Sequence, residues 1–183
     1  GSFSGVIQDS ASSATLAAVL TMRERSLRWQ GNEDGLSQHP KLRLYCSGEA
    51  HSSIDRAAWV AGIGSDNIVR IPVSGAHRSM DPEGLRQAIK NDLAAGHLPI
   101  GVIACTGATG MGACDDIAAV IDVAQNFDLY IHVDAAWAGS AMICPEFRAL
   151  WSGVERADSV VFNPHKWLGV QFDCSAHFLK NPE

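Results

Sequence analysis

Asn163-Pro164-His165-Lys166-Trp167 is the stretch around which this chain is organised, together with Ile131-His132-Val133-Asp134-Ala135-Ala136-Trp137 about thirty residues upstream. In both places an apolar run gives way to small, polar and aromatic residues. Strands of a parallel α/β sheet are apolar runs of this kind, and ligands bind beyond their carboxyl ends. The two stretches therefore predict a site in which one strand end supplies an amine and another supplies a carboxylate.

Lys166 and Asp134 each have an ordinary explanation when taken alone. A lysine past a strand end can keep its ammonium group in water, and an aspartate there can cap a helix. Together they match the way in which proteins hold pyridoxal phosphate, with a lysine in a Schiff base and a carboxylate against the ring nitrogen. A Schiff base also removes a charge that is costly to bury without a partner. The pair thus predicts a pyridoxal phosphate site.

Several separated motifs resemble the group II pyridoxal-phosphate decarboxylases. In chain order they are His-Val-Asp-Ala-Ala-Trp-Ala-Gly-Ser-Ala at 132–141, Cys-Pro-Glu-Phe-Arg at 144–148, Asn-Pro-His-Lys-Trp at 163–167 and Phe-Asp-Cys-Ser-Ala at 172–176. Within the group they look most like the aromatic-L-amino-acid branch, which contains dopa, tryptophan and tyrosine decarboxylases. The resemblance covers nearly the whole chain, and it implies pyridoxal 5'-phosphate as cofactor and decarboxylation of an aromatic L-amino acid to the amine and carbon dioxide.

The resemblance assigns roles to residues for which the sequence alone leaves alternatives open. Ser10 or Ser12 can cap a helix that begins there, but a helix N-terminus is also an anion site, and the matching segment in the family holds the cofactor phosphate. Ala11 and Ser12 are therefore expected to bind phosphate. His51 lies between a strand and a helix, where a histidine can serve as a cap; the resemblance implies that it stacks on the cofactor ring and takes part in catalysis with Lys166 and Asp134.

Four further cofactor contacts follow from the same resemblance. Thr109 lies in a glycine-rich turn at 106–113, which alone indicates a flexible strand-to-helix connection. In the family the matching threonine lies beside the cofactor's aspartate, although Ala108 and the extra glycines of this chain depart from the animal enzymes. Ala136, Asn163 and His165 are the other expected contacts.

Alternating apolar runs and helical patterns predict an α/β fold with a mainly parallel seven-stranded sheet and helices on both faces. The strands are expected at 5–8, 42–47, 67–73, 100–105, 131–134, 159–162 and 174–179. Helices are expected from about 10 to 25 and at 52–59, 82–95, 117–126 and 145–151. The connection at 167–172 is too short for a parallel crossover, so the last strand should be antiparallel. Residues 1–183 are expected to form one domain that resembles the large domain of fold-type I pyridoxal-phosphate enzymes.

Composition excludes several classes of function. The chain has 183 residues, 46% of them hydrophobic, and a formal net charge of −6, which disfavours nucleic acid as a partner because phosphates attract lysine and arginine. No apolar run approaches the ~20 residues of a membrane span, and no signal peptide is evident. Five isolated cysteines indicate reduced, largely buried thiols. We therefore expect a cytoplasmic protein with a small-molecule substrate and no membrane partner.

Alternatives to aromatic amino acid decarboxylation stay open. One is another group II branch that acts on histidine, glutamate or diaminobutyrate, or an aldehyde-forming relative, and another is a non-catalytic sheet core that serves folding or dimerisation. The family works as homodimers, so self-association is expected. Its complete enzymes are much longer, with a catalytic tyrosine loop and a C-terminal small domain. The chain is therefore expected to be a fragment of the large-domain core that is slow or inactive alone.

Overall fold

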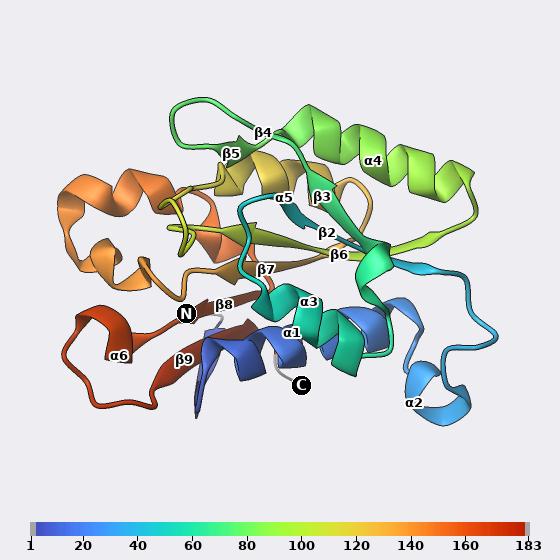
Figure 1. Cartoon of the computed structure of the whole chain (residues 1–183), viewed down its shortest axis with the longest axis horizontal. Helices are drawn as coiled ribbons and strands as arrows, with labels where there is room; N and C mark the ends of the chain where they lie inside the picture. Colours follow the sequence, from blue (N-terminus) through green and yellow to red (C-terminus); the bar gives the residue numbers. More distant parts are fainter. Residues whose placement is uncertain (1–2, 182–183) are drawn as a thin grey trace.

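One sheet runs through the part of the chain that the structure describes, residues 3–181 of a computed structural model (Figure 1). Its seven strands have the order β1-β9-β8-β7-β6-β2-β3. In chain order they are β1 (Phe3–Gln8), β2 (Leu42–Ser47), β3 (Ile68–Ile71), β6 (Leu98–Cys105), β7 (Tyr130–Asp134), β8 (Ser159–Phe162) and β9 (Ser175–Lys180). The strands β8, β7, β6, β2 and β3 are mutually parallel, whereas β9 runs antiparallel to both β8 and β1. The expected mainly parallel sheet with an antiparallel last strand is confirmed.

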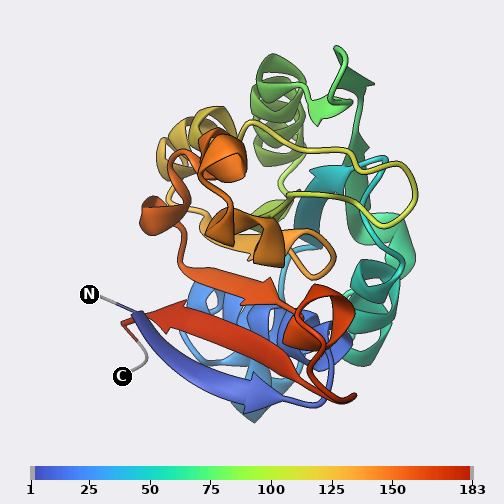
Figure 2. The ribbon, with the colours of Figure 1, turned by 90° about the vertical axis from the view of Figure 1, so that its left-hand side faces the viewer.

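Helices cover both faces of this sheet (Figures 1 and 2). The α-helices are α1 (Ala11–Ser26), α2 (Gly31–Asp34), α3 (Ser53–Val60), α4 (Pro82–Ala94), α5 (Ile117–Gln125) and α6 (Pro164–Trp167). On one face, Met22 of α1 and Ile54 of α3 pack with Leu44 and Ile103 of the sheet. The helices α4 and α5 pack on the opposite face in a second apolar core. Because both faces are covered, the central strands read as continuous apolar runs.

The segment predicted as a strand at 67–73 is shorter than expected. Asn67 belongs to a 3-10 helix, η1 (Ser65–Asn67), and β3 ends at Ile71 because Pro72 has no N–H to continue the ladder. The chain then leaves the sheet and forms a separate hairpin of β4 (Val73–Ser74) and β5 (Ser79–Met80). The sequence did not predict this hairpin.

The segment at 145–151 is a 3-10 helix rather than an α-helix. It lies in a series of three short 3-10 helices, η2 (Gly139–Ile143), η3 (Pro145–Trp151) and η4 (Val154–Arg156). Such tight turns are short and irregular, so the 3.6-residue pattern of an α-helix is a poor guide to them. The series carries the chain from the end of β7 to the start of β8.

Capping explains where two of the longer helices begin. The Asp81 carboxylate accepts the N–H of Glu83 at 3.1 Å, with Pro82 as the first helical residue of α4. The Asp116 carboxylate accepts the N–H of Ala119 at 3.0 Å at the start of α5. Its neighbour Asp115 is buried and instead accepts the N–H groups of Met80 and Cys105, both at 2.7 Å. That carboxylate therefore ties the hairpin to the end of β6.

The five cysteines are free thiols, of which Cys46, Cys105 and Cys114 are buried. Among the helices in residues 3–181, none is long and apolar enough to cross a membrane.

Candidate active site

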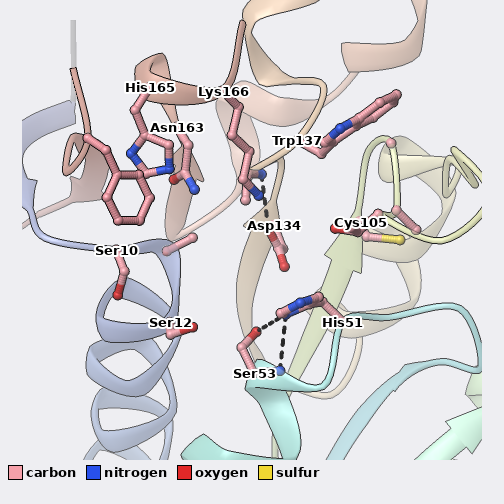
Figure 3. Close-up of a pocket in the computed structure, with 16 residues that line it drawn as sticks. Ser10, Ser12, His51, Ser53, Cys105, Asp134, Trp137, Asn163, His165 and Lys166 are labelled. Atoms are coloured by element: carbon pink, nitrogen blue, oxygen red, sulfur yellow. Dashed lines mark hydrogen bonds between the residues drawn. The ribbon is translucent and has the colours of Figure 1, made fainter. Parts of the chain in front are cut away.

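A cavity of about 190 Å³ opens where β6, β7 and β8 end and α1 begins (Figure 3). Neighbouring parallel strands place their carboxyl ends at one edge of a sheet, so residues distant in sequence meet there. All nine of the residues predicted to contact the cofactor line this cavity: Ala11, Ser12, His51, Thr109, Asp134, Ala136, Asn163, His165 and Lys166. The acid at the end of β7 and the amine beyond β8 therefore share one cavity, as the sequence predicted.

Asp134, the last residue of β7, is a largely buried carboxylate. One of its oxygens accepts the N–H of Ala136 at 3.0 Å. Burial raises the pKa of the carboxyl, although this hydrogen bond and the charges of His51 and Lys166 act in the opposite direction. Among the described residues no cationic group lies within ion-pair distance, 4.0 Å, of its oxygens. A protonated ring nitrogen is the kind of partner that such a carboxylate fits.

Lys166 is carried by α6, a single helical turn that follows β8. Pro164 is its first residue, and the N–H of Lys166 donates to the carbonyl of Asn163 at 3.0 Å. The lysine side chain extends from this turn toward Asp134 (Figure 3). An amine at one side of the cavity and a carboxylate at another match the two ends of a pyridine ring that carries an aldehyde opposite its nitrogen.

Asn163 and His165 each make a structural hydrogen bond in addition to lining the cavity. The hydroxyl of Ser175 donates to the Asn163 side-chain oxygen at 2.7 Å, and the N–H of Cys174 donates to His165 Nδ1 at 2.9 Å. Both partners lie on the chain that returns into β9. These bonds orient the two side chains, and their expected contacts with the cofactor remain predictions.

The N-terminus of α1 lies at one end of the cavity. Ser10 is the N-cap, and its hydroxyl accepts the N–H of Ser13 at 3.2 Å. The N–H groups of Ala11 and Ser12 precede the first residue that can bond within the helix, so they are free to bind an anion, and the positive end of the helix dipole favours one. Ser10 therefore caps the helix, while Ala11 and Ser12 fit the phosphate of the cofactor.

His51 combines the two roles that the sequence left open. Its Nδ1 accepts the N–H of Ser53 at 3.2 Å and lies 3.0 Å from the Ser53 hydroxyl, so it caps the start of α3. The same ring borders the cavity on the side of Asp134 (Figure 3). Because the cap holds one edge of the imidazole, the orientation of the ring is set in advance. Such a ring fits the stacking role that the resemblance implies.

Thr109 lies on an exposed loop that follows β6. The loop begins at Thr106, whose N–H donates to the carbonyl of Asp134 at 3.0 Å, so the backbone contact with the aspartate comes from Thr106 rather than Thr109. Gly107 comes next with φ at +74°, and a Cβ placed there would lie 2.2 Å from Cβ of Ala138. The close approach of these two loops requires glycine at 107.

We predict that Gly107→Ala lowers the free energy of unfolding by about 1–3 kcal/mol, because alanine disfavours the positive φ and overlaps Ala138. Urea unfolding of the purified chain measures the change. Gly110→Ala, in the same loop, is the control, since a Cβ there meets nothing within 4 Å. Equal stability of the two variants would show that the loops can separate without cost.

Seven residues that line the cavity were not among the predicted cofactor contacts: Ser10, Ser53, Cys105, Gly107, Ala108, Trp137 and Phe172. Cys105 could have been found, because it is the last residue of β6 and pairs in register with Asp134. Phe172 lies in the loop before β9, and only the path of that loop brings it against His165, with ring centroids 4.6 Å apart.

A second, larger cavity of about 540 Å³ lies among the 3-10 helices, β8 and β9. Among its lining residues only Glu155 is ionisable, so it holds neither an amine nor an acid–base pair. The smaller cavity is therefore the candidate active site.

Comparison with known proteins shows which sequences and structures the chain resembles. The family model described as "Pyridoxal-dependent decarboxylase conserved domain" matches residues 2–183. The chain is 46% identical to an aromatic-L-amino-acid decarboxylase of Sus scrofa over 98% of its own length, and 39% identical to tryptophan decarboxylase 2 of Oryza sativa. It covers 37% of the former and 35% of the latter, so it spans little more than a third of the curated relatives that it matches.

Solved structures give the same result. The crystal structure of Oryza sativa TDC with PLP and tryptamine matches 98% of the chain, and 37% of its own, with a TM-score of 0.91 and 39% identity. Mouse CSAD matches with a TM-score of 0.93 and 36% identity, again over 98% of this chain and 38% of its own.

Proposed function

Because the chain belongs to the pyridoxal-dependent decarboxylase family, we propose that it serves the decarboxylation of an aromatic L-amino acid to the corresponding amine and carbon dioxide. Pyridoxal phosphate is the cofactor of this family. The proposal rests above all on one observation: Asp134 and Lys166, which follow different strands, line one cavity together with the N-terminus of α1. Aromatic specificity is proposed because aromatic-L-amino-acid and tryptophan decarboxylases are among the relatives most similar to the chain.

The side chains of the cavity have complementary roles in this proposal. When bound, pyridoxal phosphate supplies an electron-accepting ring for the electron pair that remains after the carboxylate leaves. Lys166 would supply the amine that holds the cofactor covalently. Asp134 keeps a proton on the ring nitrogen, since a buried carboxylate favours a cation beside it. Ala11 and Ser12 bind the phosphate through their N–H groups, and His51 holds the ring flat from one face.

The test is attachment of the cofactor to Lys166. The chain mixed with pyridoxal phosphate should develop an absorbance band near the visible edge, and borohydride reduction followed by peptide mass spectrometry should find the pyridoxyl group on the peptide that contains Lys166. We expect Lys166→Ala to abolish both signals. Lys90→Ala, an exposed lysine on α4, should leave both unchanged. A band that survives in Lys166→Ala, or a label on other lysines only, would contradict the proposal.

The competing activity is oxidative formation of an aldehyde. It is worth testing because 4-hydroxyphenylacetaldehyde synthase of Rhodiola rosea matches the chain at 39% identity, with a TM-score of 0.91. Chromatography of the products from dopa, tryptophan and tyrosine separates amine from aldehyde. Glutamate and histidine belong in the same panel, because turnover of either one alone would place the protein in another branch of the family.

We further propose that the protein is a cytoplasmic homodimer. Large apolar side chains are exposed, among them Ile143, Phe147 and Phe172, and exposed apolar surface favours association. Free cysteines are typical of a reducing compartment. Sedimentation velocity of the purified chain gives its oligomeric state, and a monomer at micromolar concentration would contradict the dimer.

A further inference from the structure

Two indole rings lie against each other beside the cavity. Trp137 and Trp167 meet edge to face, with ring centroids 4.9 Å apart and planes at 88°. Trp137 follows Asp134 by three residues, and Trp167 directly follows Lys166. The pair therefore joins the segment that carries the carboxylate to the turn that carries the amine.

We propose that the Trp137–Trp167 contact is a positioning device that sets the direction in which Lys166 enters the cavity. This inference rests on the proposed function, since it concerns the same amine. Neither tryptophan is assigned a part in the chemistry: both act through the backbone that carries Asp134 and Lys166.

The turn that bears Lys166 needs such support because it is short. The helix α6 has four residues, and a single isolated turn is marginal in water. One backbone hydrogen bond, from the N–H of Asn163 to the carbonyl of Ala136 at 3.2 Å, joins the start of this turn to the other segment. Ser175 and Cys174 hold Asn163 and His165 from the side of β9, so among the described residues this is the one backbone hydrogen bond that holds the turn from the side of Asp134. The indole contact lies at the far end of the turn and adds a second point of attachment.

The loop that follows the turn and leads to β9 makes few contacts with the rest of the chain. The N–H of Cys174 donates to His165, but the residues between Trp167 and Cys174 are exposed, with Phe172 74% accessible. Within this loop the Phe172 ring contacts His165, on the side of the turn away from Asp134, so the indole contact is the side-chain contact that joins the turn to the segment of Asp134. Loss of the indole contact is thus expected to release Lys166 from one side while the strands β7 and β8 stay in place.

Exposure indicates that the pair serves the site rather than the core. Trp137 is 39% accessible and Trp167 is 45% accessible, whereas the core side chains are almost fully buried. Substitution of either indole is therefore expected to leave the chain folded. Trp59, on α3, is 59% accessible and provides a matched control of the same residue type outside the cavity.

The decisive experiment separates attachment from non-covalent binding. Pyridoxal phosphate reacts with Lys166, whereas pyridoxine 5'-phosphate has an alcohol in place of the aldehyde and can use only the phosphate and ring-nitrogen contacts. In Trp137→Ala and in Trp167→Ala, the absorbance of the attached cofactor should appear roughly tenfold more slowly or slower still. The reason is that a reacting group held in the wrong orientation reacts much more slowly. The dissociation constant of pyridoxine 5'-phosphate should stay unchanged in Trp167→Ala, because Trp167 does not line the cavity, and should change far less than the attachment rate in Trp137→Ala.

Three further variants serve as controls. Trp137→Phe retains an aromatic ring and should restore most of the attachment rate, while Trp59→Ala should behave as the wild type. The double variant Trp137→Ala with Trp167→Ala should be no slower than either single variant, since one contact is lost in all three. Circular dichroism and the thermal midpoint of the cofactor-free proteins confirm that they are folded.

The results distinguish this inference from the proposed function. A wild-type chain that never attaches pyridoxal phosphate would overturn both. Attachment by the wild type at the same rate as by the alanine variants would overturn the positioning role alone. So would an equal loss of pyridoxine 5'-phosphate binding in these variants, because that loss indicates general damage to the cavity.

Discussion

Acidification below pH 6.5 should lower the free energy of unfolding steeply, because two histidines are buried as neutral rings. His132 on β7 and His177 on β9 lie edge to face with centroids 5.7 Å apart, and both are almost fully inaccessible. Burial, followed by the neighbouring His177, lowers the pKa of His132 from 6.5 to about 3, and burial also lowers the pKa of His177. Below pH 6.5 these two rings are therefore protonated in the unfolded chain while they stay neutral in the folded chain.

The sign and size follow from proton linkage. Between the ordinary pKa of histidine and the lowered one, the unfolded state holds more protons, so stability falls as pH falls. Each histidine that stays neutral contributes up to about 1.4 kcal/mol per pH unit in that window. A proton on Nε2 of either ring would have no acceptor, since Nε2 of both rings is buried without a hydrogen-bond partner among the described residues.

Urea unfolding at a series of pH values between 7 and 4 measures this effect. Buried carboxyls with raised pKa, such as Asp115 and Asp158, act with the opposite sign, so the comparison is made between variants. His177→Leu should flatten the dependence, because burial lowers the pKa of His177, while His77→Gln, at an exposed site, should leave it unchanged. Parallel profiles of wild type and His177→Leu would contradict the prediction.

Asp134→Asn should weaken the binding of pyridoxal phosphate by about 10–100-fold, which corresponds to the loss of a charge-assisted hydrogen bond. Asparagine can still accept the N–H of Ala136, so the geometry of the loop is kept. What disappears is the negative charge that we propose faces the ring nitrogen. Titration of the chain with the cofactor, followed by absorbance, gives the two dissociation constants.

The same change should stabilise the cofactor-free chain at neutral pH. Because burial raises the pKa of Asp134, the folded state holds its proton more tightly than the unfolded state does, and stability falls as pH rises through the window between 3.8 and the raised value. Asparagine has no proton to lose and escapes this cost. Glu146→Gln, an exposed acid outside the cavity, controls for net charge. Undiminished cofactor binding by Asp134→Asn would contradict the role of Asp134.

The strands could be predicted because a run of apolar residues indicates a buried strand without reference to the rest of the chain. A run such as Ile100–Cys105 is apolar throughout, and a segment of that kind suits a strand buried on both sides. The prediction was wrong at 67–73, where Pro72 ends β3, and at 145–151, where a 3-10 helix replaces the expected α-helix. In both places the path of the chain depends on partners that are distant in sequence.

The site was predictable where its residues directly follow strands or begin helices. Asp134 ends a strand and Lys166 lies in the short turn after the next strand, and the motifs around both residues are specific. Trp137 and Phe172 were missed because a cavity wall made by loops has no periodic pattern in the sequence. His132 and His177 were equally hidden as a pair, since each looks like an ordinary residue within its own strand.

By itself the sequence determined which segments are strands, which residues carry an amine, an acid or a free helix terminus, and to which family the motifs belong. These properties are local, because they depend on hydrophobic runs and on the chemistry of single side chains. Only the tertiary structure decided that Trp137 touches Trp167, that the histidines share one buried space and that Gly107 lies against Ala138. Those contacts depend on strand order and loop path, which arise from packing across the whole sheet.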